Sequence, residues 1–257
     1  MKHLIITGAS KGLGEAVAIK GLALYDHVWC VSRTESAIIK EYTSAQSASY
    51  HFLPTDLSKA QDVDHCLAHL WAEIALSSIT SIHLINNAAT LSPMGLAGHV
   101  GRLSAMRAAF SLNVEALIAF CEWFLEKTTS LAADKRILNI SSGAGRKAYP
   151  AWSVYCATKA AVDRYSTCVS VEQGEHNFPG KIVSLAPGVI ETDMQATIRA
   201  QEKENFPLLD RFIQLKEEGK LWAPSYAAEL LVGFLHSRAF GQDPLFDLRD
   251  WAAQVSS

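Results

Sequence analysis

A tyrosine and a lysine four residues apart are the side chains of this chain best suited to moving a proton. They are Tyr155 and Lys159, at the two ends of the run YCATK. Residues at this spacing share one face of a helix, so the two side chains can converge. An ammonium group beside a phenol stabilises the phenolate and lowers the phenol pKa, which suits a tyrosine that acts as a general acid. The spacing alone is more typical of an ordinary amphipathic helix, so other residues have to decide.

A glycine-rich turn near the start of the chain is the second such feature. Residues 7–14 read TGASKGLG and follow directly on the apolar run LII. Gly8 allows a sharp turn, Gly12 allows the backbone to approach a pyrophosphate, and Gly14 allows the next helix to pack close to the strand. The N-terminus of that helix then points at the phosphates. A strand, this turn and a helix in this order are typical of a nucleotide-binding fold.

Strands and helices alternate along the whole chain and would position these residues. The pattern predicts a doubly wound α/β fold of the Rossmann type, with a seven-stranded, mainly parallel sheet and helices on both faces. We find no repeat, low-complexity tract or linker, and we expect a single domain over residues 1–257. Cofactor and substrate then bind beyond the carboxyl ends of the strands. The expected strands are Leu4–Thr7, His27–Ser32, Tyr50–Pro54, Ile82–Asn86, Arg136–Ser141, Lys181–Ala186 and Leu245–Asp247, and the expected helices span residues 12–24, 59–76, 101–128, 152–174 and 224–236.

Further short motifs stand in a fixed order along the chain. They are TGASKGLG at 7–14, DL at 56–57, NNAA at 86–89, Asn113, NISS at 139–142, YCATK at 155–159 and PGVIET at 187–192. With these motifs the chain resembles the classical short-chain dehydrogenase/reductase family over nearly its whole length. The resemblance implies an enzyme that reduces a carbonyl group with a nicotinamide cofactor.

The resemblance also implies roles for the polar residues. Tyr155 would give a proton to the developing alkoxide, while Lys159 would lower the pKa of the phenol and bind the nicotinamide ribose. Ser142, thirteen residues before the tyrosine, would hydrogen-bond the substrate oxygen. Strand alternation points the neighbouring Ser141 elsewhere. Asn113 would hold a water that links Lys159 to solvent.

The choice of dinucleotide is read at the end of the second strand. NAD enzymes generally place a carboxylate there, whereas this chain has VSRT at 31–34. Arg33 can bind the 2′-phosphate of NADPH, and Lys11 adds a second cation on the same side. We therefore expect NADPH. The expected cofactor-binding residues are Gly8, Ser10, Lys11, Gly12, Leu13, Gly14, Ser32, Arg33, Asp56, Leu57, Asn87, Ala88, Tyr155, Lys159, Pro187, Gly188, Ile190, Thr192 and Met194.

For some of these residues the resemblance implies a specific contact. Asp56 would accept a hydrogen bond from the adenine amino group, and Leu57 would pack on the adenine ring. Asn87 and the alanine that follows it would line the adenosine ribose. Thr192, with the backbone of Ile190, would fix the carboxamide of the nicotinamide.

Longer segments are more specific than these motifs. They are SIHLINNA at 81–88, NISSGAG at 139–145, WSVYC at 152–156, TDMQ at 192–195 and LKEEGKL at 215–221. Within the family they resemble sepiapterin reductases and bacterial benzil reductases. This implies reduction of a vicinal dicarbonyl, or of a side-chain ketone, on an aromatic or pterin ring. The expected substrate-binding residues are Ser142, Gly143, Tyr149, Trp152, Gly188 and Asp247, and Met194 and Trp222 could add to a flat apolar wall.

Two of these expected substrate-binding roles have an alternative explanation in ordinary packing or solvation. The aromatic residues could equally pack in the core or in a dimer contact. Asp247 matches the aspartate with which sepiapterin reductases accept hydrogen bonds from the pterin ring, but a solvated aspartate at a strand end explains it as well. Residues 193–222 would form one or two helices over the site. Their inward face would come from Met194, Ile198, Phe206, Leu209, Phe212 and Leu215.

Composition and charge exclude other classes of protein. The net charge of −3 over 257 residues gives no electrostatic case for nucleic acid or an anionic membrane. We find no apolar run long enough to cross a bilayer and no room for a cleavable signal before the first strand. The five cysteines are scattered and are interpreted as reduced, so we expect a cytoplasmic protein. The resemblance further implies a homodimer through residues 101–128 and 152–174.

Three alternative functions are less compatible with the sequence. A serine hydrolase needs a glycine two residues before its nucleophile, and neither Ser141 nor Ser142 has one. A zinc site would need a further ligand beside His65 and His69, so no metal is expected. A sensor that binds NADPH without turnover would be expected to lack the tyrosine or the lysine of YCATK; it stays the alternative to an enzyme.

Overall fold

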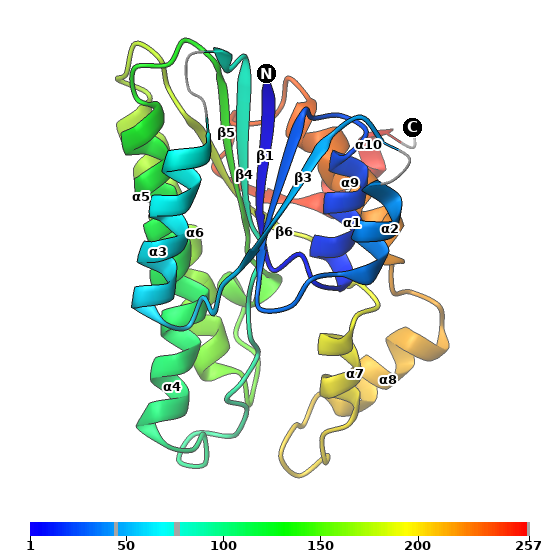
Figure 1. Cartoon of the computed structure of the whole chain (residues 1–257). Helices are drawn as coiled ribbons and strands as arrows, with labels where there is room; N and C mark the ends of the chain where they lie inside the picture. The colour runs from blue at the N-terminus through cyan, green and yellow to red at the C-terminus, as the bar shows by residue number, and fades with distance from the viewer. Residues whose placement is uncertain (44–45, 75–77, 256–257) are drawn as a thin grey trace.

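The sheet of this protein contains every strand expected from the sequence. The computed structural model describes residues 1–43, 46–74 and 78–255, and one sheet has the spatial order β3-β2-β1-β4-β5-β6-β7. Every neighbouring pair is parallel, so all carboxyl ends lie at one edge, which faces downward in Figure 1. The strands are β1 (Lys2–Thr7), β2 (His27–Ser32), β3 (Ser49–Pro54), β4 (Ser81–Asn86), β5 (Asp134–Ile140), β6 (Lys181–Ala186) and β7 (Leu245–Asp247).

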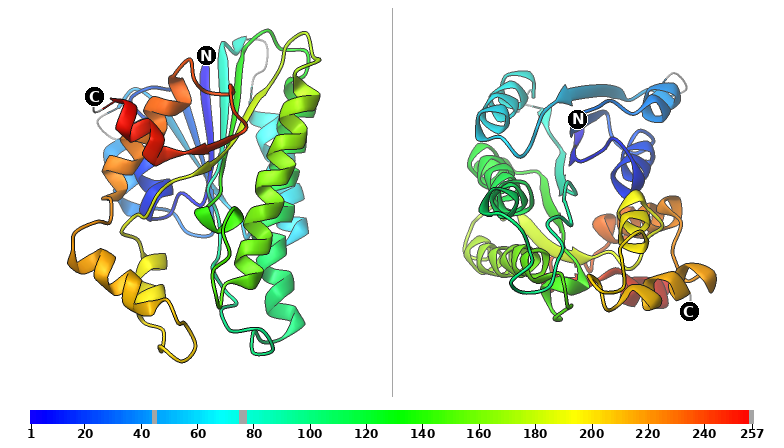
Figure 2. Two further views of the ribbon diagram at one scale, coloured as in Figure 1. Left: turned by 180° about the vertical axis from the view of Figure 1, so that it is seen from behind. Right: turned by 90° about the horizontal axis from the view of Figure 1, so that it is seen from below.

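Helices cover both faces of this sheet. α1, α2, α9 and α10 lie on one side, and α3, α5 and α6 lie on the other (Figures 1 and 2). The expected helices are present, and the structure adds two short ones, α2 and α10. The helices are α1 (Gly12–Gly21), α2 (Ala37–Thr43), α3 (Ala60–Glu73), α4 (Leu103–Phe110), α5 (Ala116–Thr128), α6 (Ser153–Gln173), α7 (Asp193–Arg199), α8 (Leu209–Glu217), α9 (Pro224–His236) and α10 (Leu248–Val255).

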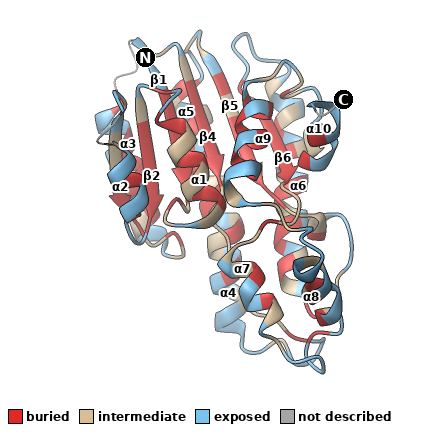
Figure 3. Cartoon of the chain, turned by 90° about the vertical axis from the view of Figure 1, so that its right-hand side faces the viewer, coloured by how far each residue is buried: buried red, intermediate tan, exposed pale blue. Residues whose placement is uncertain are grey.

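The middle of each strand is mostly apolar because both faces of the sheet are covered. On β1, Ile6 packs in the cluster formed with α1 and α9, while Ile5 packs in the cluster formed with α3 and α5. Figure 3 shows the strands as the most deeply buried part of the molecule. The five cysteines are unpaired, as their scattered positions predict.

The helical segment expected at residues 101–128 is interrupted in its middle. A π-helix, Ser111–Glu115, joins α4 to α5 and contains Asn113. By length and composition alone, Leu103–Thr128 also passes for a membrane span, which the sequence analysis did not expect. The core helix of a folded domain passes the same test, and Phe120 and Phe124 of this segment are fully buried. We therefore treat it as a core helix.

Residues 193–222 form α7 and α8 at the carboxyl edge of the sheet (Figure 1). We call residues 193–222 the covering segment. Its apolar side chains point inward as expected, because Ile198, Phe206, Leu209 and Phe212 are all buried in one cluster. The charged residues between them remain on the outside.

Candidate active site

The residues predicted for the site meet at the carboxyl edge of the sheet. Asn87 directly follows β4, Ser142 stands two residues after the end of β5, and Gly188 stands two residues after the end of β6. Asp247 ends β7 and pairs in register with Ala186 of β6. The glycine-rich turn follows β1 at the same edge. The parallel sheet thus gathers segments that are far apart in the sequence.

Close backbone contacts fix the glycine-rich turn. Gly8 and Gly12 have φ angles of +71° and +63°, a region that glycine adopts without strain. A side chain on Gly14 would collide with the carbonyl oxygen of Gly8. The Asn87 side-chain amide donates to the carbonyl oxygens of Gly8 and Thr7 at 3.0 and 3.2 Å. Asn87 therefore holds the turn in place, which is a more specific role than the one predicted from the sequence.

The shape of this turn fits a nucleotide diphosphate. Lys11 occupies the N-cap of α1 without a side-chain cap, so the first backbone N–H groups of the helix stay available to an anion. A side chain at Gly12 would come within 3.3 Å of Thr192, so the turn and the segment after β6 lie side by side. These two segments would hold the diphosphate and the nicotinamide end of a dinucleotide.

The cations predicted to select NADPH are both exposed. Arg33 has no ion-pair partner in the described part of the chain. Lys11 pairs with Asp193, with 2.6 Å between Nζ and Oδ2, a contact that the sequence did not predict. One oxygen of Asp56 already accepts hydrogen bonds from the backbone N–H and the hydroxyl of Ser58. Its other oxygen lies 3.7 Å from the Lys59 ammonium group, so an adenine amino group would share that oxygen with the lysine.

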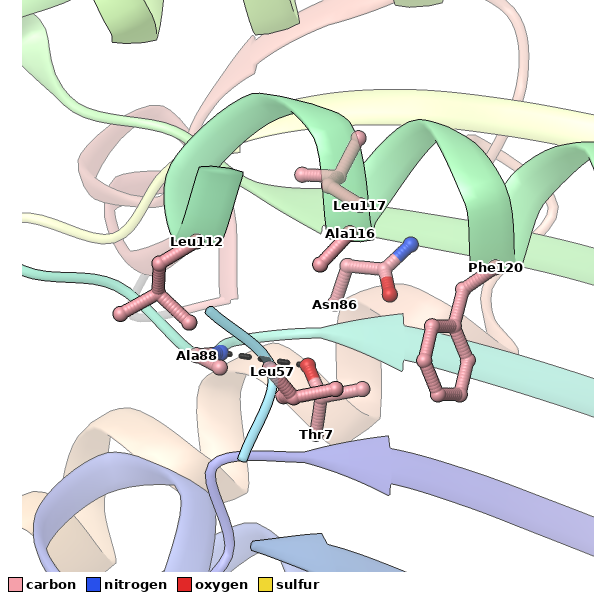
Figure 4. Close-up of a pocket in the computed structure, with 8 residues that line it drawn as sticks. All are labelled: Thr7, Leu57, Asn86, Ala88, Leu112, Ala116, Leu117 and Phe120. Atoms are coloured by element: carbon pink, nitrogen blue, oxygen red, sulfur yellow. Dashed lines mark hydrogen bonds between the residues drawn. The ribbon is translucent and has the colours of Figure 1, made fainter. Parts of the chain in front are cut away.

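Three of the predicted cofactor residues turn their side chains inward. Leu13 and Leu57 are buried in the core, and the Ser32 hydroxyl donates to the carbonyl oxygen of Thr34 at 2.9 Å. Only a small part of the Leu57 side chain is open to a nucleotide, and its packing on the adenine ring stays a prediction. Figure 4 shows the small cavity of about 10 Å³ that Leu57 lines together with Thr7, Asn86, Ala88, Leu112, Ala116, Leu117 and Phe120.

Tyr155 and Ser142 meet as predicted. Tyr155 lies in the first turn of α6 and is buried. The half-buried Ser142 hydroxyl accepts a hydrogen bond from the backbone N–H of Ala144 at 3.1 Å. Burial raises the pKa of Tyr155 to about 12, and a hydrogen bond with the Ser142 hydroxyl acts in the opposite direction. The phenol is therefore protonated at neutral pH, as a proton donor has to be.

Lys159 lies beside the tyrosine but acts on it less than the sequence predicted. Its Nζ donates to the backbone carbonyl of Ile140 at 2.7 Å and lies 5.8 Å from the centroid of the Tyr155 ring. Burial lowers the pKa of Lys159 to about 8, against the attraction of Asp163. The structure shows no lowering of the Tyr155 pKa by Lys159: burial of the phenol is the largest effect, and the ammonium group donates to the carbonyl oxygen of Ile140 instead.

Asn113 uses its whole side chain for structural hydrogen bonds. Its Oδ1 accepts from the backbone N–H of Thr90, and its Nδ2 donates to the backbone carbonyl of Thr90, both at 2.8 Å. Nδ2 also donates to the Thr158 hydroxyl at 3.1 Å. The side chain therefore fastens the loop after β4 to α6, next to Lys159. A water link from this residue to the lysine would use its backbone, and the predicted link stays a prediction.

Aromatic rings from residues 149–155 and from the covering segment pack around Trp152. Trp152 stacks on Tyr149 and on Phe206, with ring centroids 5.3 Å apart in both pairs. The Phe212 ring packs against the Trp152 ring at an angle. The Tyr155 and Trp152 rings meet edge to face, with their centroids 5.9 Å apart. We call these five residues the aromatic cluster. The predicted substrate residues Tyr149 and Trp152 thus lie next to the proton donor.

Gly143 and Met194 also border this region. A side chain on Gly143 would lie 3.8 Å from the Tyr149 hydroxyl, and Met194 packs against the cluster. Trp222 does not join it, contrary to expectation. Its ring covers Gly188, where a side chain would approach it to 3.1 Å, and its backbone pairs with Ile190.

Asp247 reaches the site but is already engaged. Its Oδ1 accepts from the backbone N–H and Nε of Arg249, and its Oδ2 accepts from the guanidinium at 2.6 Å. Burial raises the pKa of Asp247, but the hydrogen bonds and the charge of Arg249 outweigh this effect and lower it overall. The aspartate is therefore ionised, and a pterin would have to compete with Arg249 for it.

The segment after β6 is tied to the covering segment. Pro187 and Gly188 open it, and Gly188 has a φ of +80°. Glu191 forms ion pairs with Arg199 at 2.8 Å and with Lys216 at 2.9 Å. The nicotinamide-binding residues predicted here would therefore move together with α7 and α8.

Some residues that shape the site were missed by the sequence analysis. Asp163 lies one helical turn after Lys159, and its negative charge raises the pKa of the lysine, against the effect of burial. Arg146 pairs with Asp163, with 3.1 Å between Nε and Oδ2. The four-residue spacing of Lys159 and Asp163 was the available signal. Nothing in the sequence indicated the arginine.

Comparison with known proteins bears on this geometry. A sequence model of the short chain dehydrogenase family matches residues 2–203, the range that holds the glycine-rich turn, Ser142, Tyr155 and Lys159. The chain belongs to this family. It is accordingly an oxidoreductase of the kind that acts on CH–OH and C=O groups with a nicotinamide cofactor, which confirms the resemblance seen in the motifs.

Similar proteins match over almost the whole chain. Benzil reductase ((S)-benzoin forming) of Bacillus cereus is 38% identical over 242 residues, which cover 94% of this chain and 97% of the relative. Sepiapterin reductase of Mus musculus is 29% identical over 255 residues, which cover 96% of each. The crystal structure of the KRED1-Pglu enzyme covers 96% of this chain and 100% of that chain at 24% identity, with a TM-score of 0.80. That structure shows the same fold.

Proposed function

We propose that this protein is an NADPH-dependent reductase of aromatic vicinal dicarbonyl compounds, the class to which benzil belongs. One arrangement carries the proposal: the Trp152 ring meets the Tyr155 phenol edge to face, at 5.9 Å, inside the apolar aromatic cluster. A flat aromatic substrate held on these rings would place its carbonyl beside the phenol. The 38% identity to a benzil reductase supports the same substrate class.

The charges around the glycine-rich turn support NADPH as the reductant. Arg33 is an exposed cation at the end of β2, and no carboxylate occupies residues 31–34. Lys11 lies at the start of α1, where its exposed ammonium group can reach a phosphate by leaving Asp193. Two cations at this position, with no carboxylate at residues 31–34 to accept a hydrogen bond from a ribose hydroxyl, would favour a 2′-phosphate over a 2′-hydroxyl.

The chain's own residues would handle the oxygen of the substrate. When bound, the nicotinamide would supply a hydride to the carbonyl carbon. Ser142 would donate a hydrogen bond to the carbonyl oxygen, and Tyr155 would pass its proton to that oxygen as negative charge develops. Lys159, fixed by its bond to Ile140, would hold the nicotinamide ribose. With a pKa of about 8, it can also exchange a proton near neutral pH.

A pterin ketone is the second candidate substrate. Asp247 favours it, because a carboxylate at the end of β7 presents two acceptors at the edge where the site lies. The 29% identity to a sepiapterin reductase supports the same idea. Against it stands Arg249, which occupies both oxygens of that carboxylate. We therefore rank the dicarbonyl first.

We also propose a homodimer, in the cytoplasm, as the working form. Leu103 of α4 is 61% exposed and Val171 of α6 is 73% exposed, so both predicted contact helices keep apolar surface outside the core. A second copy would cover such surface.

A coupled absorbance assay tests the proposed function. The purified protein is mixed with NADPH and benzil, and oxidation of NADPH is followed in the near ultraviolet. We expect steady consumption and formation of benzoin, with a much smaller rate when NADH replaces NADPH. Binding of NADPH without consumption, over a panel of diketones and pterins, would favour the sensor alternative instead.

A further inference from the structure

The indole N–H of Trp152 is a buried hydrogen-bond donor without a partner. Trp152 is 5% exposed, and its Nε1 has no hydrogen-bond acceptor in the described part of the chain. Buried donors are satisfied in most native structures, because leaving one unpaired costs its full desolvation energy. An unpaired donor inside a candidate active site therefore calls for a ligand.

The position of this donor is set by α6. Trp152 is the N-cap of the helix and stands three residues before Tyr155, so the two side chains share one face. The indole contacts Tyr155 by its edge, and its two flat faces lie against the rings of Tyr149 and Phe206. Ser142 and Tyr155 already provide two hydroxyl donors for one oxygen. The indole N–H is a third donor, in the same aromatic cluster as Tyr155.

We propose that Trp152 Nε1 donates a hydrogen bond to the second carbonyl oxygen of a vicinal dicarbonyl substrate, the one that is not reduced. The proposal rests on the proposed function and names the feature by which the site would recognise that substrate class. A vicinal dicarbonyl carries two acceptor oxygens on adjacent carbons. One would bind Ser142 and Tyr155, and the other would satisfy the indole.

This arrangement predicts selectivity for diketones over monoketones. Indole N–H is a donor only, so a substrate with a methylene group in place of the second carbonyl would leave it unpaired. A site built to hydrogen-bond a substrate group discriminates strongly against the analogue that lacks the group. Hydrophobic contact with the aromatic cluster would be the same for both substrates.

A pair of matched substrates tests the proposal. Benzil and deoxybenzoin have the same two rings, but deoxybenzoin has one carbonyl. In Trp152→Phe, which keeps a ring and loses the N–H, we expect kcat/KM for benzil to fall at least about tenfold, as for one lost hydrogen bond. The value for deoxybenzoin, which loses only ring contact, should fall by a clearly smaller factor, so the ratio of the two kcat/KM values should drop. Equal losses on both substrates, or no loss on either, would overturn the proposal.

Trp123 provides the matched control. It is also buried, and its Nε1 is also without a hydrogen-bond partner in the described part of the chain, but it lies on α5 in a hydrophobic cluster that contains no residue of the aromatic cluster. Trp123→Phe removes the same group at a comparable depth and should leave the ratio of the two kcat/KM values unchanged. A shift of that ratio in Trp123→Phe as large as in Trp152→Phe would mean that the effect comes from packing.

A spectroscopic measurement separates this proposal from the proposed function. In isotope-labelled protein, the indole N–H resonance of Trp152 is identified by its absence from Trp152→Phe. Benzil is then added together with NADP⁺, which cannot transfer a hydride. A hydrogen bond to the second carbonyl should move the resonance of the indole N–H proton downfield. An unchanged resonance overturns the proposal. So does an upfield shift, which an N–H directed at the face of the Phe212 ring would give. Turnover of benzil without the shift leaves the proposed function standing. A downfield shift without turnover of benzil supports the hydrogen bond from Trp152 and contradicts the proposed reductase function.

Discussion

Lys11 and Asp193 join the glycine-rich turn to the covering segment by an ion pair of 2.6 Å. Lys11 caps α1, and Asp193 is the first residue of α7. Their side chains are 70% and 73% exposed, so the pair adds little to folding stability. The ion pair matters for cofactor binding, because the carboxylate of Asp193 would compete with the 2′-phosphate of a cofactor for the ammonium group of Lys11.

Asp193→Asn should therefore strengthen NADPH binding. Without the carboxylate, Lys11 is free for the phosphate, and we expect the KM for NADPH to fall about two- to fivefold, the range of a surface ion pair. The KM for NADH should not change, because NADH has no 2′-phosphate. Steady-state kinetics with both cofactors checks this. An unchanged KM for NADPH would mean that Lys11 does not bind the phosphate.

Arg33→Ala should remove most of the preference for NADPH. A charge-assisted contact with the phosphate is worth about 1.5–3 kcal/mol, roughly ten- to a hundredfold in affinity. Arg33 has no protein partner in the described chain, so its loss should leave the thermal unfolding temperature nearly unchanged. Titration of protein fluorescence with NADPH and NADH measures both affinities. Equal affinities already in the unmodified protein would contradict the assignment.

Tyr155→Phe should abolish carbonyl reduction while NADPH still binds. The substitution removes only the hydroxyl that gives the proton, and the ring can keep its edge contact with Trp152. The measurement is kcat with benzil beside the dissociation constant of NADPH. More than about a tenth of the original kcat would show that another group supplies the proton.

Asp247→Ala distinguishes the two candidate substrates. If Asp247 accepts hydrogen bonds from a pterin ring, the KM for sepiapterin should rise at least about tenfold, while benzil, which has no ring N–H, is unaffected. Arg249→Gln should act in the opposite direction on sepiapterin, because it frees the carboxylate from its present partner. Equal losses on both substrates in Asp247→Ala would indicate a structural role for the Asp247–Arg249 pair.

Histidines at the amino edge of the sheet should make the protein less stable in acid. Burial, and then the charge of His27, lowers the pKa of His3 from 6.5 to about 4. The unfolded chain therefore binds more protons than the folded one between these values. The contribution of His3 to the free energy of unfolding should be complete above pH 6.5 and should decline as the pH falls toward 4. Denaturant unfolding across this range tests the slope, and His3→Leu should reduce it. A slope that His3→Leu leaves unchanged would assign the effect to other groups, such as His236, whose pKa burial also lowers to about 4.

The strands and the glycine-rich turn could be predicted because each has a strong local cause. A strand covered on both faces is mostly apolar, as β1 is at Leu4, Ile5 and Ile6, and the backbone at Gly8 and Gly12 favours glycine. The helices α2 and α10 could not be predicted, because segments of seven and eight residues are too short for a helical period to stand out.

Side-chain partners were the part of the site that the sequence left open. Helical spacing places Lys159 on the face of Tyr155, but only the fold places the carbonyl of Ile140 within 2.7 Å of its ammonium group. Likewise, Asp247 could be located at a strand end, but α10 begins directly after it and turns Arg249 back onto the carboxylate. Such contacts depend on how the chain continues in space, which periodicity does not report.

The stacking of Phe206 on Trp152 would limit the turnover rate of aromatic substrates that bind on this face of the indole. The two rings lie 5.3 Å apart and within 11° of parallel, so a substrate ring that stacks on this face of Trp152 has to replace Phe206. Phe206 belongs to the covering segment, which must then withdraw for each substrate to enter and again for each product to leave. For aromatic substrates, the turnover rate would then be governed by how often α7 and α8 open. The speed of the chemical step would matter less.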